Sequence, residues 1–330
     1  MVFINGISYY LPENKLSNDD LNELFPDWSV NKIAAKTGIQ ERRIAGEGEF
    51  VSTMAVKAAK NLFLEYNISP GEVEFIILCT QSPDYVLPTT ACLVQEELGI
   101  PTTSGALDIN LGCSGYIYGL SAAKGLLLSE DVNNVLFITS ETYSKYLGEH
   151  DKSVRTIFGD GASATFISKT PGGLQIGKTS FGTDGKGALN LMVKAGGSRF
   201  PLLAPASASD LKPADSYLFM NGAEIFSFTL KIVPPIISSV LEKNQLNIDD
   251  IDLFVFHQAN KYMLEHLRLK MSIPEDKFFI YIENCGNTVS STIPIAIKEA
   301  MIQEKIKPGM KVLLAGFGVG YSWGATIVQF

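Results

Sequence analysis

The sequence predicts an α/β protein made of two similar halves. Residues 58–82, "AAKNLFLEYNISPGEVEFIILCTQS", and residues 236–260, "IISSVLEKNQLNIDDIDLFVFHQAN", share one pattern: an amphipathic helix, Asn-Ile, an acidic turn and an apolar strand. Two further pairs of segments keep this spacing of half the chain, namely residues 133–142 with 310–320 and residues 107–127 with 282–301. A repeat of this length indicates two α/β units rather than a short-period solenoid.

The expected elements follow from local patterns. "EFIILC" and "DLFVFH" are unbroken apolar runs, which are typical of strands covered on both faces. The segments that begin at residues 107 and 282 each lead into a helix full of small residues, which can pack closely in a buried position.

We place the boundary between the halves near Thr170-Pro171-Gly172-Gly173, so that the halves would span residues 1–171 and 172–330. Residues 183–212 are rich in Gly, Ser, Ala and Pro, so we expect long surface loops there.

Composition limits the function. The chain has 330 residues, 46% of them hydrophobic, which is enough for a large core. A formal net charge of −8 argues against a nucleic-acid-binding protein. The uninterrupted apolar runs are far shorter than the roughly 18 residues of a membrane span, and the first residues lack a signal-peptide pattern. We therefore expect a cytoplasmic protein. Four cysteines without CxxC spacing predict neither a disulfide framework nor a metal site.

Cys113 is the first candidate for chemistry. Most free cysteines are small buried hydrophobic residues, and Cys79, Cys92 and Cys285 fit that description. Cys113 lies in "NLGCSGYIYG", between glycines and at the change from a strand pattern to a helix pattern. The N–H groups at the start of a helix favour a thiolate over a thiol. We therefore predict that Cys113 is a nucleophile.

His257 is the preferred partner among only three histidines. It closes the run "DLFVF" and begins the polar cluster "HQAN", at a strand end where open α/β sheets bind ligands. A satisfied core histidine is the alternative. His150 and His266 lie in sequence settings typical of solvated side chains.

Asn287 is the third candidate, because the internal repeat aligns it with Cys113. If a pseudo-twofold axis relates the halves, the two corresponding helix starts face one cleft, and His257 reaches the same cleft. An asparagine at a helix start can instead be an N-cap. A capping asparagine can still direct an amide hydrogen at a ligand.

The glycine-rich segment "GFGVGYSWG", residues 316–324, is not a dinucleotide-binding fingerprint, because Tyr321 occupies the last glycine position and no βαβ unit follows. Such a turn at a strand end can bring a backbone N–H close to an oxyanion. "FGDGASA", residues 158–164, predicts a tight turn between strands.

Together these segments resemble the 3-oxoacyl-[acyl-carrier-protein] synthase III family of the thiolase-like superfamily. The resemblance extends along almost the whole chain, through "TGIQERRIA", "GCSGYIYGL", "FGDGASA", "GGSRFP", "MNGAEIF", "HQAN", "GNTVSSTIP" and "GFGVGYSWG". It implies a thiolase-like fold with two pseudo-symmetric halves in five αβαβα layers, and a homodimer. It also implies a Cys-His-Asn active site at Cys113, His257 and Asn287.

The resemblance implies a decarboxylating Claisen condensation. Cys113 would take an acyl group from a thioester, with an oxyanion hole formed by the backbone N–H groups of Cys113 and Val319. Val319 replaces a glycine usual in the family. His257 Nε2 and the Asn287 amide would stabilise the enolate formed when malonyl-[acyl-carrier-protein] loses carbon dioxide. The product is a 3-oxoacyl thioester, and neither a metal nor a redox cofactor takes part.

Further positions carry implied binding roles. Gly222, Phe226 and Asn260 match a pantetheine tunnel. Leu87, in "SPDYVLPTT", matches a loop that closes the acyl pocket of the neighbouring subunit. Lys261 stands near the position of an arginine that meets the acyl carrier protein, and with Gln258 it is the implied contact for that partner.

Lys32, Lys36 and Lys152 stand where well-known members hold the adenine end of coenzyme A with a tryptophan and two arginines. Lysine can meet a phosphate but lacks a planar surface that stacks on a base. We therefore expect that adenine is not held in the usual way, and both coenzyme A and a carrier protein stay open as acyl donor.

Other functions stay open too. The condensation could serve fatty-acid initiation or a specialised acyl pathway. The fold could also support an acyltransferase acting on an alcohol or amine, or a non-catalytic subunit that binds acyl carriers. Asn287 favours condensation over simple acyl transfer, since acyl transfer has less need of a second enolate donor. The presence of all three active-site residues counts against a non-catalytic subunit.

Overall fold

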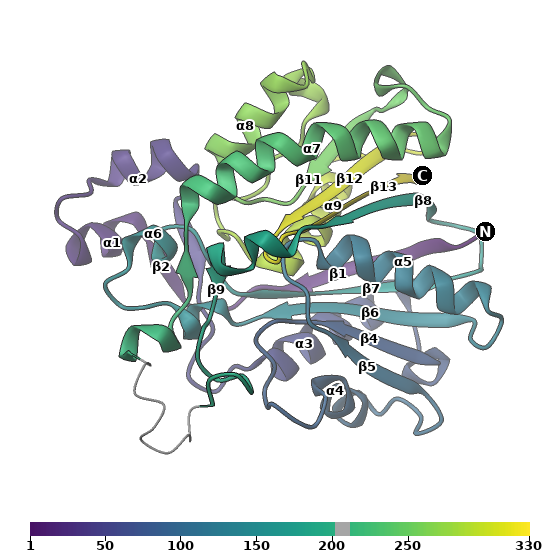
Figure 1. Cartoon of the computed structure of the whole chain (residues 1–330). Helices are drawn as coiled ribbons and strands as arrows, with labels where there is room; N and C mark the ends of the chain where they lie inside the picture. Colours follow the sequence, from purple (N-terminus) through teal and green to yellow (C-terminus); the bar gives the residue numbers. More distant parts are fainter. Residues whose placement is uncertain (202–211) are drawn as a thin grey trace.

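The computed structural model describes residues 1–201 and 212–330, and Figure 1 shows helices stacked around one extended sheet. The strands of this sheet lie in the order β11-β12-β13-β8-β1-β7-β6-β4-β5. The first half comprises β1 (Phe3–Tyr10), α3 (Val51–Tyr66), β4 (Phe75–Cys79), α4 (Thr90–Leu98), β5 (Gly105–Ile109), α5 (Gly115–Leu128), β6 (Asn134–Glu141) and β7 (Gly161–Ser168). The second half comprises β8 (Leu174–Thr183), α7 (Gly222–Asn244), β11 (Leu253–Phe256), α8 (Lys261–Lys270), α9 (Thr292–Ile302), β12 (Lys311–Gly318) and β13 (Ser322–Gln329).

The strand order repeats between the halves. The first half runs β5-β4-β6-β7-β1, and the second runs β11-β12-β13-β8. The strand that would complete the second half is reduced to a single bridge between Phe254 and Phe278. The halves join where β1 pairs with β8 in antiparallel fashion. This topology confirms the predicted pair of similar α/β units. We propose that the chain divides in the turn between β7 and β8, into residues 1–171 and 172–330.

Five layers result. Helices α5 and α9 lie in the middle, because α5 contacts strands of both halves and α9 contacts β11 as well as β1 and β7. Helices α3 and α4 cover the outer face of the first half, and α7 covers β8, β12 and β13 with α8 beside it. The αβαβα arrangement implied by the resemblance is confirmed.

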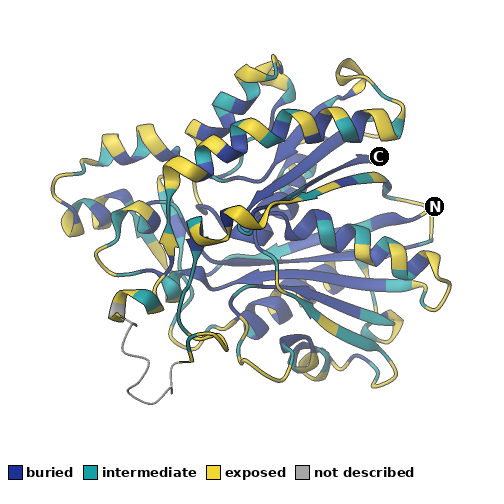
Figure 2. Ribbon diagram, viewed as in Figure 1, coloured by how far each residue is buried: buried dark blue, intermediate teal, exposed yellow. Residues whose placement is uncertain are grey.

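The core lies between these layers, and Figure 2 shows the central strands almost entirely buried. The apolar runs predicted as strands form β4 and β11, with Ile76–Cys79 and Leu253–Phe256 buried. The small residues of α5 let it pack closely against β6. A Cβ atom added to Gly119 would lie 2.0 Å from the Phe137 ring.

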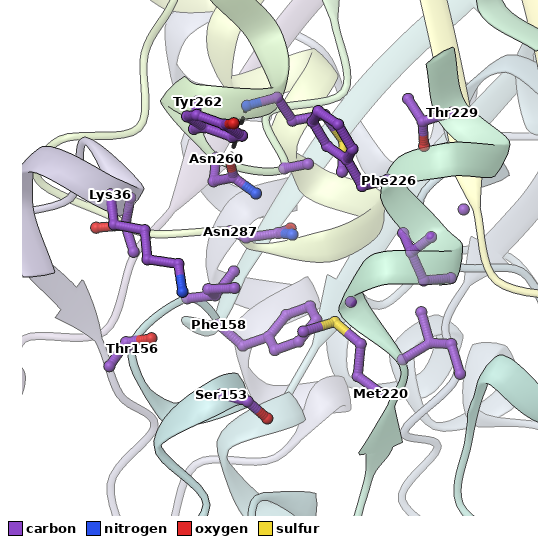
Figure 3. Close-up of a pocket in the computed structure, with 18 of the residues that line it drawn as sticks. Lys36, Ser153, Thr156, Phe158, Met220, Phe226, Thr229, Asn260, Tyr262 and Asn287 are labelled. Carbon is purple, nitrogen blue, oxygen red and sulfur yellow. Dashed lines mark hydrogen bonds between the residues drawn. The ribbon is translucent and has the colours of Figure 1, made fainter. Parts of the chain in front are cut away.

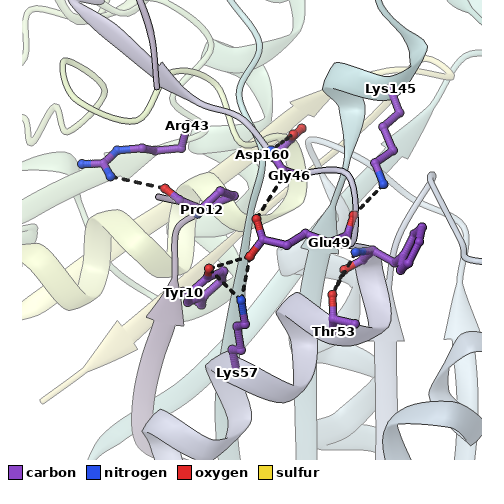
Figure 4. A network of polar contacts seen from close by, with 11 residues as sticks. Tyr10, Pro12, Arg43, Gly46, Glu49, Thr53, Lys57, Lys145 and Asp160 are labelled. Atoms are coloured by element: carbon purple, nitrogen blue, oxygen red, sulfur yellow. Dashed lines mark hydrogen bonds and ion pairs between the residues drawn. The ribbon is translucent and has the colours of Figure 1, made fainter. Parts of the chain in front are cut away.

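An insertion after β1 forms a separate corner of the molecule. It contains β2 (Lys15–Ser17), α1 (Asn18–Leu24), α2 (Val30–Thr37) and β3 (Glu41–Arg43), and the short helix α6 (Lys152–Arg155) lies beside it. Figure 4 shows how Glu49 ties the end of this insertion to β1 and α3. Its carboxylate accepts hydrogen bonds from Tyr10 (2.6 Å), Lys57 (2.7 Å) and Gly46 N–H (3.0 Å). Partial burial opposes the charge, but these donors outweigh it and lower the pKa of Glu49 to about 2.

The structure modifies two expectations. The first is that no segment is apolar enough to span a membrane, since α7 is long and apolar enough to do so by length and composition. In this structure, however, α7 packs along β8 and β13 as a helix of the outer layer.

The second expectation concerns the loops. The predicted loop region 183–212 contains the 3-10 helix η3 (Gly185–Asn190) and the short strand β9 (Leu191–Met192), which pairs with β10 (Phe219–Met220). Residues 202–211 of that prediction lie outside the described residues.

Candidate active site

A cavity of about 420 Å³ contains the three predicted catalytic residues. Cys113, His257 and Asn287 all line it and are only 6%, 2% and 3% exposed. Its walls come largely from α7 and from the segment around Phe158, as Figure 3 shows. The topology therefore brings together residues that are up to 174 positions apart, from Cys113 to Asn287.

Cys113 lies just before α5, which begins after the N-cap Ser114. The glycine-rich turn between β12 and β13 lies against it. A Cβ atom added to Gly318 would lie 2.8 Å from the Cys113 sulfur, and one added to Gly316 would lie 2.7 Å from the Cys113 carbonyl oxygen. The N–H of Val319 donates a hydrogen bond to the Cys113 sulfur. Glycine at these positions lets the strand end approach the nucleophile closely.

The burial of the Cys113 sulfur acts against the predicted thiolate. Burial raises the pKa of Cys113 to about 12 and outweighs the Val319 hydrogen bond, which acts in the opposite direction. Burial also lowers the pKa of His257 to about 3. Both shifts favour a neutral thiol beside a neutral imidazole at neutral pH and oppose the expected resting thiolate. A thiol in this setting would lose its proton during the attack.

His257 is fixed at the end of β11. Its backbone N–H donates to Ala315 O (2.8 Å), and its Nδ1 lies 2.7 Å from Thr292 Oγ1. The Thr292 hydroxyl donates to Val289 O (3.0 Å), so it accepts the hydrogen of Nδ1. In this arrangement Nε2 carries a lone pair, and the imidazole can take a proton at Nε2.

Asn287 is held by the "FGDG" turn. Its N–H donates to Ile157 O (2.9 Å), and its carbonyl accepts from Gly159 N–H (3.0 Å). Its side-chain Oδ1 accepts from Val289 N–H (2.9 Å), a turn bond just before the short 3-10 helix η7 (Val289–Ser291). The N-caps of η7 and α9 are Thr288 and Ser291, so the helix N-cap considered from sequence is wrong. That bond orients the amide and leaves Nδ2 as a donor, with no hydrogen bond to any residue in the described ranges. The Asn287 amide is therefore free to meet a ligand in the cavity.

The predicted binding residues fall into two groups. Gly222, Phe226 and Asn260 line the cavity, as do Lys36 and Lys152 at its outer end. Leu87, Lys32, Lys261 and Val319 are not among the residues that line it. Leu87 is 80% exposed, and Lys32 and Lys261 are exposed as well.

Gln258 requires a correction. It is fully buried, and its amide donates to Phe256 O (2.5 Å) and accepts from Tyr281 N–H (2.9 Å). It holds the segment after β11 in place, and a carrier protein at the surface would not reach it.

Trp28 is a cavity residue that sequence reasoning missed. It lines the outer end of the cavity, and the Nζ atoms of Lys36, Lys152 and Lys32 lie 4.9, 5.5 and 5.6 Å from its ring centroid. Lys152 also pairs with Asp27 (2.6 Å). An aromatic plane with several cations is therefore present, contrary to the expectation that no flat surface stands there. The available signal was spacing, since Trp28 precedes Lys32 and Lys36 by four and eight residues.

Two minor expectations were also wrong. Cys92 is exposed, whereas Cys79 and Cys285 are buried as predicted. His266 is partly buried against aromatic rings, with its centroid 4.1 Å from that of Tyr262 and 5.5 Å from that of Phe226. His150 is exposed.

A buried carboxyl lies behind the cavity. Glu141 at the end of β6 is fully buried and accepts hydrogen bonds from Gln81 N–H (3.1 Å), Ser82 Oγ (2.8 Å) and Ser290 Oγ (2.9 Å). Burial raises its pKa to about 8, although the hydrogen bonds oppose the shift. Within residues 1–201 and 212–330, no cluster of three or more His, Cys, Asp or Glu side chains could hold a metal ion.

Comparisons with known proteins agree with this geometry. A family described as 3-oxoacyl-[acyl-carrier-protein] synthase III matches residues 107–185, and its C-terminal counterpart matches residues 241–330. A β-ketoacyl-[acyl-carrier-protein] synthase III from Caldanaerobacter subterraneus subsp. tengcongensis is 37% identical over 327 residues, 99% of this chain and 97% of the relative. One from Clostridium perfringens is 36% identical over 324 residues, 98% of each chain.

Solved structures give the same result. A crystal structure of a 3-oxoacyl-(acyl-carrier-protein) synthase III is 51% identical, with a TM-score of 0.95 over 100% of this chain and 99% of the other. The synthase III of Aquifex aeolicus VF5 is 34% identical, with a TM-score of 0.89 over the whole of both chains. The fold and the cavity define the class as a thiolase-like condensing enzyme. The chain belongs to the 3-oxoacyl-[acyl-carrier-protein] synthase III family.

Proposed function

We propose that this enzyme condenses an acyl group held on Cys113 with a malonyl thioester, releasing carbon dioxide and a 3-oxoacyl thioester. The observation that carries the proposal is the convergence of Cys113, His257 and Asn287 in one buried cavity, with the Val319 N–H on the sulfur. Family membership supports the same reaction, because the relatives are β-ketoacyl-[acyl-carrier-protein] synthases.

The first half-reaction transfers the acyl group. His257 Nε2 accepts the thiol proton as the Cys113 sulfur attacks the thioester carbonyl. The backbone N–H of Val319, already directed at the sulfur, donates to the oxyanion together with the N–H of Cys113. The carbon–sulfur bond to the carrier breaks, the carrier thiol takes the proton back from His257, and an acyl-Cys113 thioester remains.

The second half-reaction uses Asn287. The malonyl thioester loses carbon dioxide, and the electron pair of the broken carbon–carbon bond forms an enolate. Asn287 Nδ2 donates to the enolate oxygen, and His257 Nε2 does so after it takes a proton from water as the negative charge develops. The enolate carbon attacks the acyl carbonyl, the bond to Cys113 breaks, and the sulfur receives that proton from His257. The bond changes need no metal and no electron carrier.

The outer end of the cavity suits the anionic carrier of a thioester. Lys36, Lys152 and Lys32 surround Trp28, so they offer positive charge beside an aromatic plane. We propose that these lysines and the exposed Lys261 meet the phosphate of the carrier, whether coenzyme A or acyl carrier protein. Gly222, Phe226 and Asn260 would line the path of its arm.

We also propose a homodimer in the cytoplasm. The loop after β4 exposes Tyr85, Val86 and Leu87 to 59%, 92% and 80%. Strand β5 forms the end of the sheet and leaves Leu107 37% exposed. A second copy that covers this apolar edge could place Leu87 at the acyl end of its neighbour's cavity.

Intact-mass measurement tests the acyl-enzyme. We expect a mass gain of one acyl group with acyl-coenzyme A or acyl-carrier-protein donors, and none in Cys113→Ala. Cys92→Ala is the matched control, because Cys92 is the exposed cysteine and should leave acylation unchanged. A gain that persists without Cys113 would reject the nucleophile.

Carbon dioxide release tests the second half-reaction. Asn287→Ala should reduce malonyl decarboxylation by about 100-fold, the loss usual for one oxyanion donor, and should spare acylation. An equal loss of both steps would assign Asn287 to the structure of the site instead. Acyl transfer to an alcohol or amine without carbon dioxide would favour the acyltransferase alternative.

A further inference from the structure

Thr229 carries a hydroxyl whose role neither the fold nor the catalytic steps explain. It lies on α7, is fully buried and lines the catalytic cavity. Its Oγ1 has no hydrogen-bond partner in the part of the chain that the structure describes. Figure 3 places it on the α7 wall of the cavity, one turn beyond Phe226.

Several other hydroxyls in or at the end of helices have partners. A threonine or serine within a helix usually donates to the carbonyl four residues earlier. Ser238 of the same helix does so with Pro234 O (3.2 Å), Thr37 of α2 with Ile33 O (2.8 Å), and Thr156 with Lys152 O (2.8 Å). Thr229 makes no such bond, so its hydrogen and its lone pairs have no partner in the part of the chain that the structure describes.

An unpaired buried hydroxyl destabilises a protein unless a ligand satisfies it. The cavity near Thr229 is lined by apolar side chains, among them Leu191, Ile225 and Phe226. A polar group that enters this region loses its water and finds few partners on the walls. The Thr229 hydroxyl is the polar group that α7 presents there.

We propose that Thr229 positions the substrate by hydrogen bonding to an amide in the arm that carries the thioester. The inference rests on the proposed function, in which the substrate is a thioester of coenzyme A or of acyl carrier protein. Both carriers end in a pantetheine arm with two secondary amides. A hydroxyl can donate to an amide carbonyl or accept from an amide N–H, so it satisfies an amide in either orientation.

The position of Thr229 along α7 indicates that its hydroxyl meets an amide of the pantetheine arm rather than the acyl chain. Phe226 packs against Tyr262, which is 51% exposed at the outer part of the cavity, with ring centroids 5.6 Å apart. Thr229 lies deeper and fully buried. It therefore stands beside the route from the surface to Cys113, where an extended arm must pass.

The test uses donors that share one acyl group but differ in amides: acyl-pantetheine with two, acyl-N-acetylcysteamine with one, and an acyl-butanethiol ester with none. The rate of Cys113 acylation is followed by intact mass. Thr229→Val keeps the shape and removes the hydroxyl. We expect it to slow acylation about tenfold with an amide-bearing donor and less than twofold with the amide-free donor. Thr229→Ser should restore most of the loss.

Equal slowing with all three donors, or no slowing with any, would overturn the assignment. Thr229→Val should melt no lower than the unmodified protein, because it removes an unpaired polar group. A binding measurement separates this inference from the proposed reaction. Pantetheine itself is titrated into Cys113→Ala and into Cys113→Ala/Thr229→Val by calorimetry. We expect about tenfold weaker binding in the double variant, and equal affinity would reject the role of Thr229 whatever reaction the enzyme performs.

Discussion

Glycine at positions 316 and 318 lets β12 approach the residue that carries the nucleophile. A Cβ atom added to either glycine would lie less than 3.0 Å from atoms of Cys113 or Ser114. The following Val319 N–H then reaches the Cys113 sulfur. At the scale of single residues, the proposed oxyanion hole therefore depends on the absence of side chains at Gly316 and Gly318.

Gly318→Ala should disable the nucleophile without unfolding the protein. The added methyl group would meet the Cys113 sulfur at 2.8 Å and displace it. We expect acylation, measured by intact mass, to fall about 100-fold, as is usual for a displacement near 1 Å at a reacting atom. Gly125→Ala on α5 is the control, because its new methyl meets nothing within 4 Å. Unchanged acylation in Gly318→Ala would mean that the sulfur has room to move.

The reactivity of Cys113 should depend on pH as that of a buried neutral thiol does. Burial raises the pKa of Cys113 to about 12 and lowers the pKa of His257 to about 3. The thiolate fraction should then rise about tenfold per pH unit from pH 7 to 10. The rate of alkylation of Cys113 by iodoacetamide, followed by mass in Cys92→Ala, should rise in parallel. A plateau between pH 6 and 9 would indicate a resting thiolate–imidazolium pair.

The sequence allowed us to predict that Cys113, His257 and Asn287 meet in one cavity, but not how burial acts on their pKa values. Cys113, His257 and Asn287 could be predicted because the repeat and the glycine-rich setting mark them before any coordinates. Burial opposes the predicted thiolate, and it was not foreseen because the helix start that favours a thiolate is local in the sequence, whereas burial depends on distant segments such as β12. Thr229 was missed for the same reason, since packing places it on the cavity. Trp28 was missed although its spacing from Lys32 and Lys36 was a signal in the sequence.

At the scale of elements, Glu141 connects three segments behind the active site. It lies at the end of β6 and accepts from Gln81 and Ser82 after β4 and from Ser290 before α9. Gln81 also accepts a hydrogen bond from Tyr143 (2.6 Å). The exposed loop 82–89 and the helix that follows Asn287 are therefore fixed by one buried carboxyl.

The free energy of unfolding should depend on pH through the titration of Glu141. Its pKa is raised from 4.5 to about 8, so the folded state binds a proton that the unfolded state releases. The free energy of unfolding gained from this group is complete below pH 4.5 and is lost as pH rises through 8. Between pH 6 and 8 the wild-type free energy of unfolding should fall more steeply than that of Glu141→Gln, by about 1 kcal/mol per pH unit.

Urea denaturation at several pH values measures that difference. Glu141→Gln has its own constant destabilisation, because an amide cannot accept as many hydrogen bonds as a carboxylate. The comparison therefore concerns the slopes rather than the absolute values. Parallel curves from pH 6 to 8 would show that Glu141 is ionised throughout, held so by its hydroxyl and N–H donors.

The elements themselves were largely predictable. The apolar runs became β4 and β11, and the segments rich in small residues became α5 and α9, because both patterns depend on neighbours along the chain. The insertion that forms the outer end of the cavity was not predicted as elements. Its helices α1 and α2 are short, and they are held mainly by tertiary contacts such as Asn18 with Ile39 O (2.8 Å) and Arg42.

At the scale of the whole molecule, the proposed dimer gives a direct prediction. Leu87→Asp places a charge at a position that is 80% exposed in one chain and would be buried between two. We expect light scattering to show a dimer for the wild type and a shift toward monomer for the variant. Acylation should fall at least tenfold at equal protein concentration.

Leu64→Asp is the matched control, because Leu64 is 86% exposed on α3, away from the loop. It should leave both mass and acylation unchanged. A monomeric wild type with full activity would contradict the dimer, and would leave Leu87 without the proposed role at a neighbouring cavity.

The two halves end in unlike sheet borders, because the second half has the single Phe254–Phe278 bridge where the first half has the strand β5. If two molecules of the proposed dimer pair along β5, their sheets would join through backbone hydrogen bonds. Such a joint would hold the two cavities of the pair at a constant separation.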